Sequence, residues 1–403
     1  SCALIKPYVI FPFYLPIYLM RKRILFITSR PIYPIVGGDQ IRTAQCLQYL
    51  RSYFDVHEVV IGTTDDLPQP EKYDSYKYFK VAWPTHYWQA IHFLFNSDPI
   101  QVNYYYSLKV QRYIDRIIND FEIVFCNNIR TAKYVLKHSS KVRIIDFVDS
   151  ISMNYEKARY HAKFPMNLIY TIDYHRCKQY ELHLLKEFDR ASVISDKDRN
   201  YILHNSEINR DLKVIGNMAK VSDAILPERA NSIVFIGKMN YAPNVIAVRN
   251  FLKNTFPLIL KSNPLAVFYV VGTQPTQEIR DYNNGKNIIV TGFVEDMNAY
   301  LDKAAVVVAP MISGAGIQNK IIQAMGRGKC VVATPIGAEG LDIRNDEIGI
   351  ADNDSDMAAM IVSLLQNPKR RKLMGSKAKE YIKKYLSYEA IGVEFEKLLN
   401  GLY

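Results

Sequence analysis

The stretch SGAGIQNKIIQAMGRGKCVVATPIGAEGL, residues 313–341, predicts the fold of this chain more clearly than any other segment. Its small residues at the start predict a loop, and the spacing of the apolar residues over 317–325 predicts a helix. A Gly-rich turn follows, and the apolar run over 330–334 predicts a buried strand. A loop, a helix and a strand in this order are typical of an α/β protein with a parallel sheet.

The glycines of this loop indicate a site for a phosphate group. Gly314 and Gly316 let the backbone approach a bound group closely, and the first turn of the next helix directs unpaired N–H groups and a positive dipole to the same place. Lys320 falls in the first helical turns, where its ammonium adds a point charge for a diphosphate. Taken alone, the motif fits an ordinary loop–helix–strand unit better, so its surroundings decide its meaning.

The second half of the chain alternates strands and helices in the manner of a doubly wound parallel sheet. Gly237, Gly272 and Gly292 each follow a predicted strand. Ligands in such sheets bind beyond the carboxyl ends of the strands, so the pattern predicts a Rossmann-like domain with its site beside these glycines. The predicted strands are 232–236, 266–271, 287–291 and 305–309, and the predicted helices are 245–260, 297–304, 356–365, 368–385 and 387–399.

The first half starts with a second unit of the same kind. A strand over 23–28 precedes a Pro/Gly loop and a helix over 39–50, for which Asp39 is a candidate N-cap. The pair Gly37 and Gly38 either forms a tight turn or lies against a substrate or phosphate. Further strands are predicted at 56–61, 123–126, 143–147 and 191–194, and a helix at 167–188 whose charged residues Glu181, His183 and Glu187 mostly form a solvated face.

A chain of 403 residues is too long for one comfortable hydrophobic core, so we expect two Rossmann-like domains that face each other across a cleft. The linker is expected near 216–227. The predicted divisions are an N-terminal extension at 1–20, an N-terminal domain at 21–215, a C-terminal domain at 216–386 and a C-terminal helix at 387–403.

The extension at 1–20 is almost wholly apolar and aromatic, and a basic triplet follows it at 21–23. Three prolines and Lys6 interrupt it, so a spanning helix is not expected, and it has no small-residue cleavage site typical of a secretory signal. Either the residues before Met20 are an upstream extension of a natural translation start, or the segment lies on a membrane surface with the help of the basic triplet.

The composition narrows the classes of partner. The formal net charge of +11 suits nucleic acid, an anionic membrane surface or phosphorylated substrates. Because no dense basic run is present, nucleic acid is the weakest of these, and we expect none as a partner. The five cysteines are scattered and include no CxxC pair, so neither a disulfide framework nor a zinc site is predicted. A reducing, cytoplasmic compartment is expected.

Six motifs, in a specific order and spacing, carry a resemblance to a known family. From about Arg23 to the C-terminus, the chain resembles retaining glycosyltransferases of the GT-B fold, in the family-four-like group, and especially sugar transferases encoded with bacterial exopolysaccharide systems. The motifs are RPIYPIVGGDQIR at 30–42, DFVDSIS at 146–152, FDRASVISDKDR at 188–199, VFIGKMNYAPNVIAVRNF at 234–251, VTGFVEDMNAYL at 290–301 and GIQNKIIQAMGRGKCVVAT at 316–334.

The resemblance implies a nucleotide-sugar donor, UDP- or GDP-linked, held mainly by the C-terminal domain. It implies a saccharide or lipid-linked saccharide acceptor on the N-terminal side, transfer with retention, and a role in bacterial surface polysaccharide synthesis. It also implies that the C-terminal helix returns to the N-terminal domain. A peripheral contact with the inner face of the bacterial membrane is a further partner that it allows.

The resemblance also implies roles for individual residues. Lys238 and Lys320 are the candidate catalytic cations, and Asp149 is the candidate contact to a sugar hydroxyl or the acceptor. Asp149 fits equally well as a helix cap after the preceding strand. The implied donor contacts, to the phosphates and to the base, are Gly37, Gly38, Arg42, Gly237, Phe293, Val294, Gly314, Ala315, Gly316, Ile317, Asn319 and Gln323.

The chemistry implied by the family needs few further groups. Breaking the bond between the anomeric carbon and the phosphate builds negative charge on the leaving diphosphate, which lysine, arginine and helix-end N–H groups stabilise. In a retaining reaction the departing phosphate itself can take the proton of the acceptor, and none of the eight histidines stands out as a base. No metal and no cofactor are expected, because no Asp-x-Asp or histidine cluster has convincing ligand spacing.

The chain departs from the family at one pair of positions. Many members carry two glutamates, eight positions apart, across the donor loop, and here those positions hold Ala315 and Gln323. Gln323 can still hydrogen-bond a ribose hydroxyl, whereas Ala315 cannot replace a carboxylate. Two alternatives therefore stay open. One is a catalytically inactive GT-B scaffold or nucleotide-sugar-binding protein in a polysaccharide assembly complex, and the other is a nucleotide-sugar epimerase.

Overall fold

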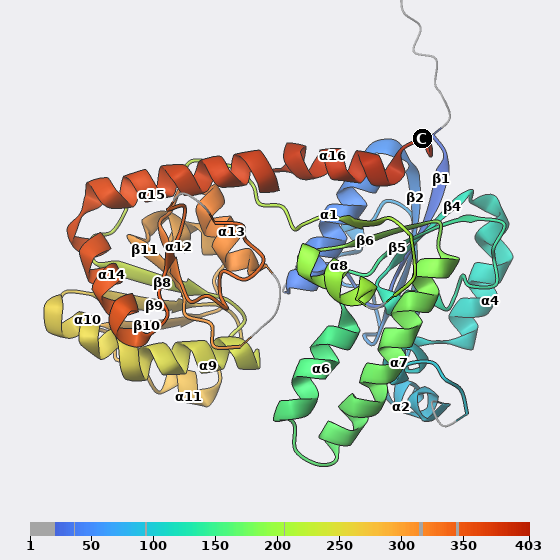
Figure 1. The fold of residues 1–403 in the computed structure, drawn as a ribbon, viewed down its shortest axis with the longest axis horizontal. Helices are drawn as coiled ribbons and strands as arrows, with labels where there is room; N and C mark the ends of the chain where they lie inside the picture. Colours follow the sequence, from blue (N-terminus) through green and yellow to red (C-terminus); the bar gives the residue numbers. More distant parts are fainter. Residues whose placement is uncertain (1–20, 36, 93–94, 205, 314–316, 344–345) are drawn as a thin grey trace, which may run out of the picture.

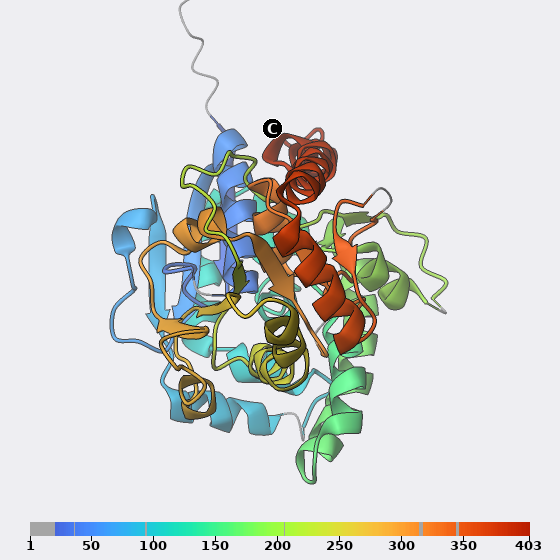
Figure 2. The same cartoon turned by 90° about the vertical axis from the view of Figure 1, so that its left-hand side faces the viewer.

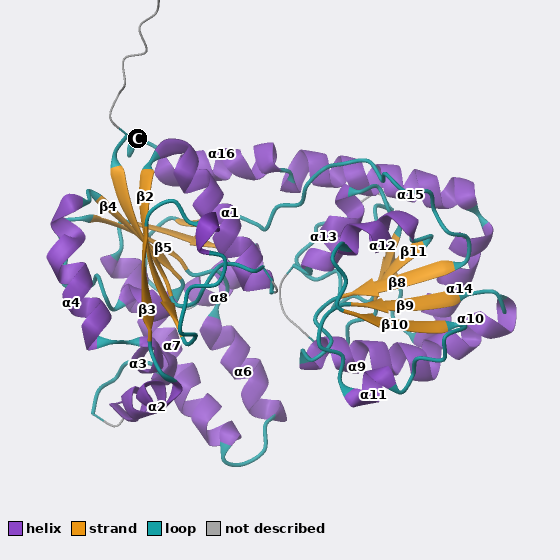
Figure 3. Ribbon diagram, turned by 180° about the vertical axis from the view of Figure 1, so that it is seen from behind, coloured by secondary structure: helices purple, strands orange, loops and turns teal. Residues whose placement is uncertain are grey.

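Two separate parallel sheets, each with helices on both faces, make up the computed structural model (Figure 1 and Figure 3). The structure describes residues 21–35, 37–92, 95–204, 206–313, 317–343 and 346–403. The N-terminal extension predicted at 1–20 lies outside these ranges. None of the helices in the described ranges is both long and apolar enough to cross a membrane.

The N-terminal domain is built on a seven-stranded sheet with the order β3-β2-β1-β4-β5-β6-β7, and every pair of neighbouring strands is parallel. Its strands are β1 (Arg23–Thr28), β2 (Asp55–Gly62), β3 (Tyr76–Lys80), β4 (Ile123–Asn127), β5 (Val142–Asp146), β6 (Arg190–Val193) and β7 (Leu212–Val214). Its helices are α1 (Gly38–Tyr53), α2 (Trp83–Ile91), α3 (Ile100–Tyr105), α4 (Leu108–Ile117), α5 (Ile129–Ala132), α6 (Ile151–His161), α7 (Met166–Glu187) and α8 (Asp196–Leu203).

The C-terminal domain has a six-stranded parallel sheet with the order β10-β9-β8-β11-β12-β13. Its strands are β8 (Ser232–Ile236), β9 (Val267–Val271), β10 (Ile288–Gly292), β11 (Val306–Ala309), β12 (Val331–Ala333) and β13 (Gly349–Ile350). The helices are α9 (Ala242–Asn250), α10 (Phe256–Ser262), α11 (Gln277–Arg280), α12 (Met297–Lys303), α13 (Asn319–Gly326), α14 (Asp354–Gln366), α15 (Pro368–Tyr381) and α16 (Tyr388–Leu399).

Alternating side chains of each strand pack on opposite faces of its sheet. On β1, Ile24 and Phe26 join the core under α1, whereas Leu25 and Ile27 join the core on the other face. In each sheet the strand order reverses direction beside the first strand, between β1 and β4 and between β8 and β11. Ligands of doubly wound sheets bind at such switch points, so each domain offers one site beyond the carboxyl ends of its central strands.

The chain crosses between the domains twice, and the two crossings are bonded to each other. The Ala219 N–H donates to the Leu386 carbonyl at 2.9 Å. Helix α1 holds both crossings, because Arg42 Nη1 donates to the Gly216 carbonyl at 3.0 Å and the Tyr49 hydroxyl donates to the Tyr388 carbonyl.

Helix α16 leaves the C-terminal domain and lies against the N-terminal domain, as expected (Figure 1). The Tyr49 ring of α1 stacks on Tyr388 and Phe395, with ring centroids 4.4 Å and 4.8 Å apart. Arg190 Nη2 donates to the Asn400 carbonyl at 2.8 Å. The core under α1 is therefore closed by residues from the far end of the sequence.

Most predicted strands are confirmed within one or two residues, but two predicted helices are divided. The helix expected over 245–260 consists of α9, a π-helical turn at Phe251–Thr255 and α10. Pro257 lies at the start of α10 and lacks an N–H group, which shifts the hydrogen-bond register just before it. The helix expected over 368–385 is likewise α15 followed by a π-helical turn at Ile382–Leu386.

One local prediction was wrong and one holds only in part. Gly37, not Asp39, is the N-cap of α1, and its N–H donates to Gln40 Oε1 at 3.1 Å. Asp39 instead pairs with Arg30 at 2.6 Å. Of the charged residues on α7, His183 and Glu187 are exposed as expected, but Glu181 is buried and accepts from the Ser152 N–H at 3.1 Å. Burial raises the pKa of Glu181 to about 7.

Candidate functional site

A buried lysine occupies the carboxyl edge of the C-terminal sheet. The Lys320 side chain lies at the start of α13, and its Nζ donates to Asn244 Oδ1 at 2.6 Å. The same Nζ lies 3.5 Å from Met311 Sδ and 4.4 Å above the centre of the Phe235 ring. The residue is only 9% exposed, and burial lowers the pKa of its ammonium to about 7. Among the described residues, no carboxylate contacts this cation.

The glycines beyond β8 and β9 allow the ends of these two strands to approach each other closely beside this lysine. A Cβ on Gly272 would lie 1.7 Å from the Gly237 carbonyl oxygen, so the two strand ends touch. A Cβ on Gly237 would lie 2.7 Å from Asn244 Nδ2. That amide donates to the Lys238 carbonyl at 3.0 Å, so Asn244 joins the turn after β8 to Lys320.

Asn244 is a site residue that the sequence predictions missed. It lies just inside α9, after a proline, in the motif that supports the resemblance. Its side chain satisfies a backbone carbonyl and the lysine together, a pairing between residues 76 positions apart that spacing along the chain does not reveal.

The amino ends of two helices from different domains meet at the junction. A Cβ on Gly38, at the start of α1, would lie 2.9 Å from Asn319 Nδ2, at the start of α13. Asn319 Oδ1 accepts from Asn217 Nδ2 of the interdomain crossing at 2.9 Å. The structure thus brings Gly38 next to the helix start that carries Lys320. Both amino ends add positive potential to the same region.

Arg42 lies one turn after Gly38 on α1, in the core of the N-terminal domain. It is fully buried, and its Nε and Nη2 donate to the two carboxylate oxygens of Asp146 at 3.0 Å and 3.1 Å. Burial alone would lower the pKa of Arg42, but the Asp146 carboxylate more than offsets this and holds it above the usual value. With Gly216 also bound, the guanidinium has a structural role, and this position does not favour the predicted donor contact.

Asp149 follows a residue in a strained conformation. Val148 has a φ of +68°, which is costly for a β-branched residue and is found mostly where a site requires it. Ser150, not Asp149, caps α6, because its Oγ accepts from the Met153 N–H at 3.2 Å. The helix-cap alternative for Asp149 is therefore wrong. Asp149 Oδ2 accepts from Asn154 Nδ2 at 2.7 Å.

The Asp149 carboxyl interacts electrostatically with one residue of the other domain. Burial raises the pKa of its carboxyl to about 6, and the nearby charge of Asp198 adds to the rise. Burial also raises the pKa of Tyr241, and the charge of Asp149 contributes to that shift. Tyr241 precedes α9 in the C-terminal domain and is 55% exposed. A tyrosine and a carboxylate from the two domains therefore lie within electrostatic reach, and the sequence predictions missed Tyr241.

Two buried carboxylates hold the loop that carries Asp149. The Ser150 N–H donates to Asp198 Oδ1 at 2.9 Å, and the Ser152 N–H donates to Glu181 Oε1. Both acceptors lie in the core of the N-terminal domain. The start of α6, and with it Asp149, is fixed by side chains from α7 and α8.

The remaining candidates lie around the same edge of the C-terminal sheet. Lys238 is exposed in the turn after β8. Phe293 follows Gly292 at the end of β10 and is 73% exposed, whereas Val294 packs against the core. Ile317 and Gln323 are half-buried. The predicted donor contacts at Gly314, Ala315 and Gly316 lie outside the described residues.

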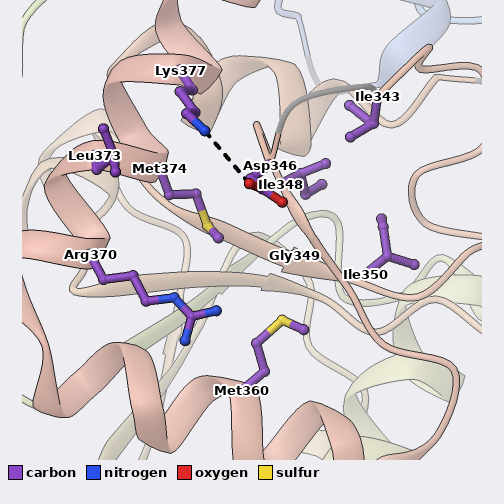
Figure 4. A pocket seen from close by; sticks show the side chains of 10 residues that line it. All are labelled: Ile343, Asp346, Ile348, Gly349, Ile350, Met360, Arg370, Leu373, Met374 and Lys377. Atoms are coloured by element: carbon purple, nitrogen blue, oxygen red, sulfur yellow. Dashed lines mark ion pairs between the residues drawn. The ribbon is translucent and has the colours of Figure 1, made fainter.

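Within the described ranges, no group of three or more His, Cys, Asp or Glu side chains is placed to hold a metal ion. A cavity of about 480 Å³ lies near β13, α14 and α15, and it shares no lining residue with the candidate site (Figure 4). Asp346 and Lys377 pair at its rim at 3.6 Å, and Arg370, which also lines it, donates to Ser363 Oγ at 3.0 Å.

Parts of this chain are similar to a known family and to known proteins. Residues 230–367 match the model of the family described as "Glycosyl transferases group 1". An uncharacterized 44.6 kDa protein in the cps region of Klebsiella pneumoniae is 26% identical over 136 residues, or 32% of this chain and 35% of that protein. An uncharacterized glycosyltransferase of Methanocaldococcus jannaschii is 26% identical over 229 residues, or 54% of this chain and 56% of that protein. The chain thus spans about a third and about half the length of these curated relatives.

Solved structures establish the fold. Sucrose-phosphate synthase from Thermosynechococcus elongatus matches with a TM-score of 0.70 and 15% identity, over 95% of this chain and 99% of that chain. Anabaena HepE in complex with UDP and glucose matches with a TM-score of 0.63 and 13% identity, over 94% and 100%. The expected GT-B fold, with two Rossmann-like domains, is therefore confirmed.

Proposed function

We propose that this GT-B protein, with its glycosyl transferases group 1 domain, moves a sugar from a nucleotide-diphosphate donor to a saccharide or lipid-linked saccharide acceptor. We further propose that it does so with retention, without a bound metal, in the cytoplasm, and in the synthesis of a bacterial surface polysaccharide. The domain match over 230–367, the cps-region relative and the UDP complex of a protein with the same fold support this proposal.

One observation carries the proposal: the Lys320 ammonium is buried among neutral groups at the switch point of the C-terminal sheet. Burying a cation without a carboxylate costs free energy. An anionic ligand that reaches this place would regain that free energy as binding. A diphosphate also fits the two helix amino ends that meet there.

The reaction follows from these groups. As the bond between the anomeric carbon and the diphosphate breaks, negative charge collects on the leaving oxygens, and Lys320 and the amino end of α13 stabilise it. Lys238, in the exposed turn after β8, adds a second cation. Asp149, held by the strained turn at Val148, accepts a hydrogen bond from a hydroxyl of the sugar or the acceptor. The departing phosphate takes the proton of the acceptor.

Two assays test the proposal. We expect release of nucleotide from one member of a panel of UDP-, GDP- and dTDP-sugars, because transferases leak some donor to water. We also expect UDP or GDP to raise the melting temperature most, since a ligand at a hundred times its Kd stabilises by about 2.7 kcal/mol. Lys320→Ala should remove most of that shift. The control is Lys137→Ala. Lys137 is exposed in a turn after α5 and pairs with Asp115.

The same assays address the scaffold alternative, which rests on the loss of the glutamate pair at positions 315 and 323. A scaffold would show the nucleotide-dependent shift but would release no nucleotide from any donor. Equal effects of Lys320→Ala and Lys137→Ala on the shift would place the donor elsewhere and contradict the proposal.

A further inference from the structure

Both tryptophans of the chain lie on one exposed helix, α2. Trp83 is 56% exposed and Trp88 is 73% exposed, and Tyr87 between them is 63% exposed. Tryptophan has the largest apolar surface of any side chain and is usually well covered in a folded protein. Its exposure here, twice on nine residues, indicates a surface that is covered in the working state of the protein.

Helix α2 is oriented with its apolar face outward. At about 100° per residue, Trp83, Tyr87 and Ile91 form one stripe with Trp88 beside it. The buried side is held instead by His86, whose Nδ1 lies 2.6 Å from the Tyr104 carbonyl oxygen and whose ring stacks on Tyr104 at 4.5 Å. The helix contains no Asp, Glu, Lys or Arg. A helix that only covered the domain would have its apolar residues buried and its polar residues exposed.

A second exposed apolar segment lies at the same end of the N-terminal domain. Around the turn between α6 and α7, Phe164 is 80% exposed, Tyr160 72% and Leu168 53%. Figures 1 and 2 show α2 and this turn at the end of the domain that is remote from α16. We call the exposed apolar side chains of α2 and of residues 160–169 the aromatic end.

Two contacts fix the segment between α2 and α3 against α7. The Ile100 N–H donates to Asp173 Oδ1 at 2.6 Å, and Arg176 Nη1 donates to the Asp98 carbonyl at 3.1 Å. The parts of the aromatic end therefore belong to one framework rather than to independent loops.

The charges beside the aromatic end are mainly positive. Between residues 151 and 172, Lys157, Arg159 and Lys163 stand against a single carboxylate, Glu156. Glu156 accepts from the Tyr201 hydroxyl at 2.8 Å and pairs with Arg159 at 3.8 Å, whereas Lys157 and Lys163 are exposed, Lys163 at the turn next to Phe164. An occupant of this surface must therefore accept aromatic side chains and match a positive rim.

We propose that the aromatic end is the surface by which this protein lies on an anionic lipid bilayer. Tryptophan, tyrosine and phenylalanine partition to the boundary between headgroups and acyl chains, and lysines beside them attract anionic headgroups. The proposal goes beyond sugar transfer and does not rest on it. It also differs from the contact expected of residues 1–20, because it uses only described residues of the N-terminal domain.

The fluorescence of the full-length chain tests the proposal, because both tryptophans lie on α2. Vesicles of equal parts phosphatidylcholine and phosphatidylglycerol should shift the emission to shorter wavelengths, protect it from acrylamide and carry the protein down on centrifugation. Vesicles of phosphatidylcholine alone should do so more weakly. The double variant Trp88→Ser/Phe164→Ser should weaken binding by at least about tenfold, since two large apolar side chains are lost.

A matched control is Ile225→Ser/Leu265→Ser, two apolar residues outside the N-terminal sheet domain that are 85% and 72% exposed. It should bind vesicles like the parent. Equal binding by both double variants would overturn the proposal, as would the absence of vesicle binding. A dimer in sedimentation equilibrium that only Trp88→Ser/Phe164→Ser dissociates would overturn it too, because a second copy would then be the occupant. Hydrolysis of soluble donor should be unchanged in both variants, which separates this test from that of sugar transfer.

Discussion

Arg42 and Lys320 are both buried cations, one in each domain, but their surroundings differ. Arg42 has a bidentate carboxylate partner and a backbone carbonyl, and its pKa is held above the usual value. Lys320 has an amide oxygen, a thioether and an aromatic ring, and its pKa falls to about 7. The first cation is neutralised within the protein. The second has no carboxylate partner among the described residues, so we expect a ligand to supply the negative charge.

The type of cation and its position in the sequence therefore do not identify a ligand contact. Both residues follow glycines in loop–helix motifs, and both were expected near the donor phosphates. The two residues differ in the chemistry of the groups that surround them. A buried charge needs an opposite charge, which either the protein or a ligand supplies. Each of the following predictions tests that difference.

The largest effect is expected from Arg42→Met. The substitution keeps most of the packing but leaves the Asp146 carboxylate buried with only the Ser192 hydroxyl, at 2.8 Å, and Cys46 beside it. Breaking a buried pair in this way costs about 3–5 kcal/mol. Urea unfolding measures it. The control Arg249→Met removes a half-exposed pair with Glu278 and should cost no more than about 1 kcal/mol. A loss of that small size for Arg42→Met would refute its structural role.

Lys320→Met should have the opposite profile. We expect donor hydrolysis to fall by about 10²–10³-fold, the usual loss when one charge-stabilising group is removed. The free energy of unfolding without ligand should stay the same or rise, because an unpaired buried cation has been replaced by an apolar side chain. Steady-state kinetics and urea unfolding on the same preparation measure both quantities. A marked loss of stability would show that Lys320, like Arg42, is paired within the protein.

The pH dependence of stability should identify the lysine. Its pKa is about 7 in the folded protein and 10.5 in an ordinary environment, so the unfolded chain binds more protons between these values. Burial of the cation therefore destabilises the protein fully below pH 7, and the penalty is lost as the pH rises. The parent should gain about 1 kcal/mol per pH unit relative to Lys320→Met between pH 8 and 9. A constant difference between the two proteins would contradict the low pKa.

The smallest effect is expected from Gly38→Ala, on the same helix as Arg42. The added methyl group would lie 2.9 Å from Asn319 Nδ2 and must displace that side chain. We expect nucleotide affinity to fall several-fold, on the order of 1 kcal/mol, while the stability changes by less than that of Arg42→Met. Isothermal titration with UDP or GDP measures the affinity. Ser52→Ala, at an exposed position of the same helix, is the control.

Much of the fold could be predicted from the sequence because its signals are local. The apolar run at Ser232–Ile236 was assigned with both ends correct, and the glycines after it marked the carboxyl edge of the sheet. Strand β3 was missed because its sequence, YKYFK, mixes aromatic residues with lysines and lies largely exposed at the sheet edge. Strand β13 has only two residues and gives no pattern.

The site was only partly predictable, for a physical reason. Lys320 and Gly38 belong to motifs that can be recognised along the chain. The role of Asn244, the burial of Glu181 and the approach of Tyr241 to Asp149 all depend on contacts between distant segments. Charge alone placed Glu181 on the surface, because only the fold reveals the Ser152 amide that it accepts from.

The packing of α16 on α1 has a consequence for how the protein is made. Translation completes all seven strands of the first sheet long before residues 388–399 leave the ribosome. Until then, Tyr49 lacks the rings of Tyr388 and Phe395, although other apolar residues of α1 already pack on the first sheet. The domain that is synthesised first therefore completes its packing only after residues 388–399 have been made, so removal of these residues should destabilise it.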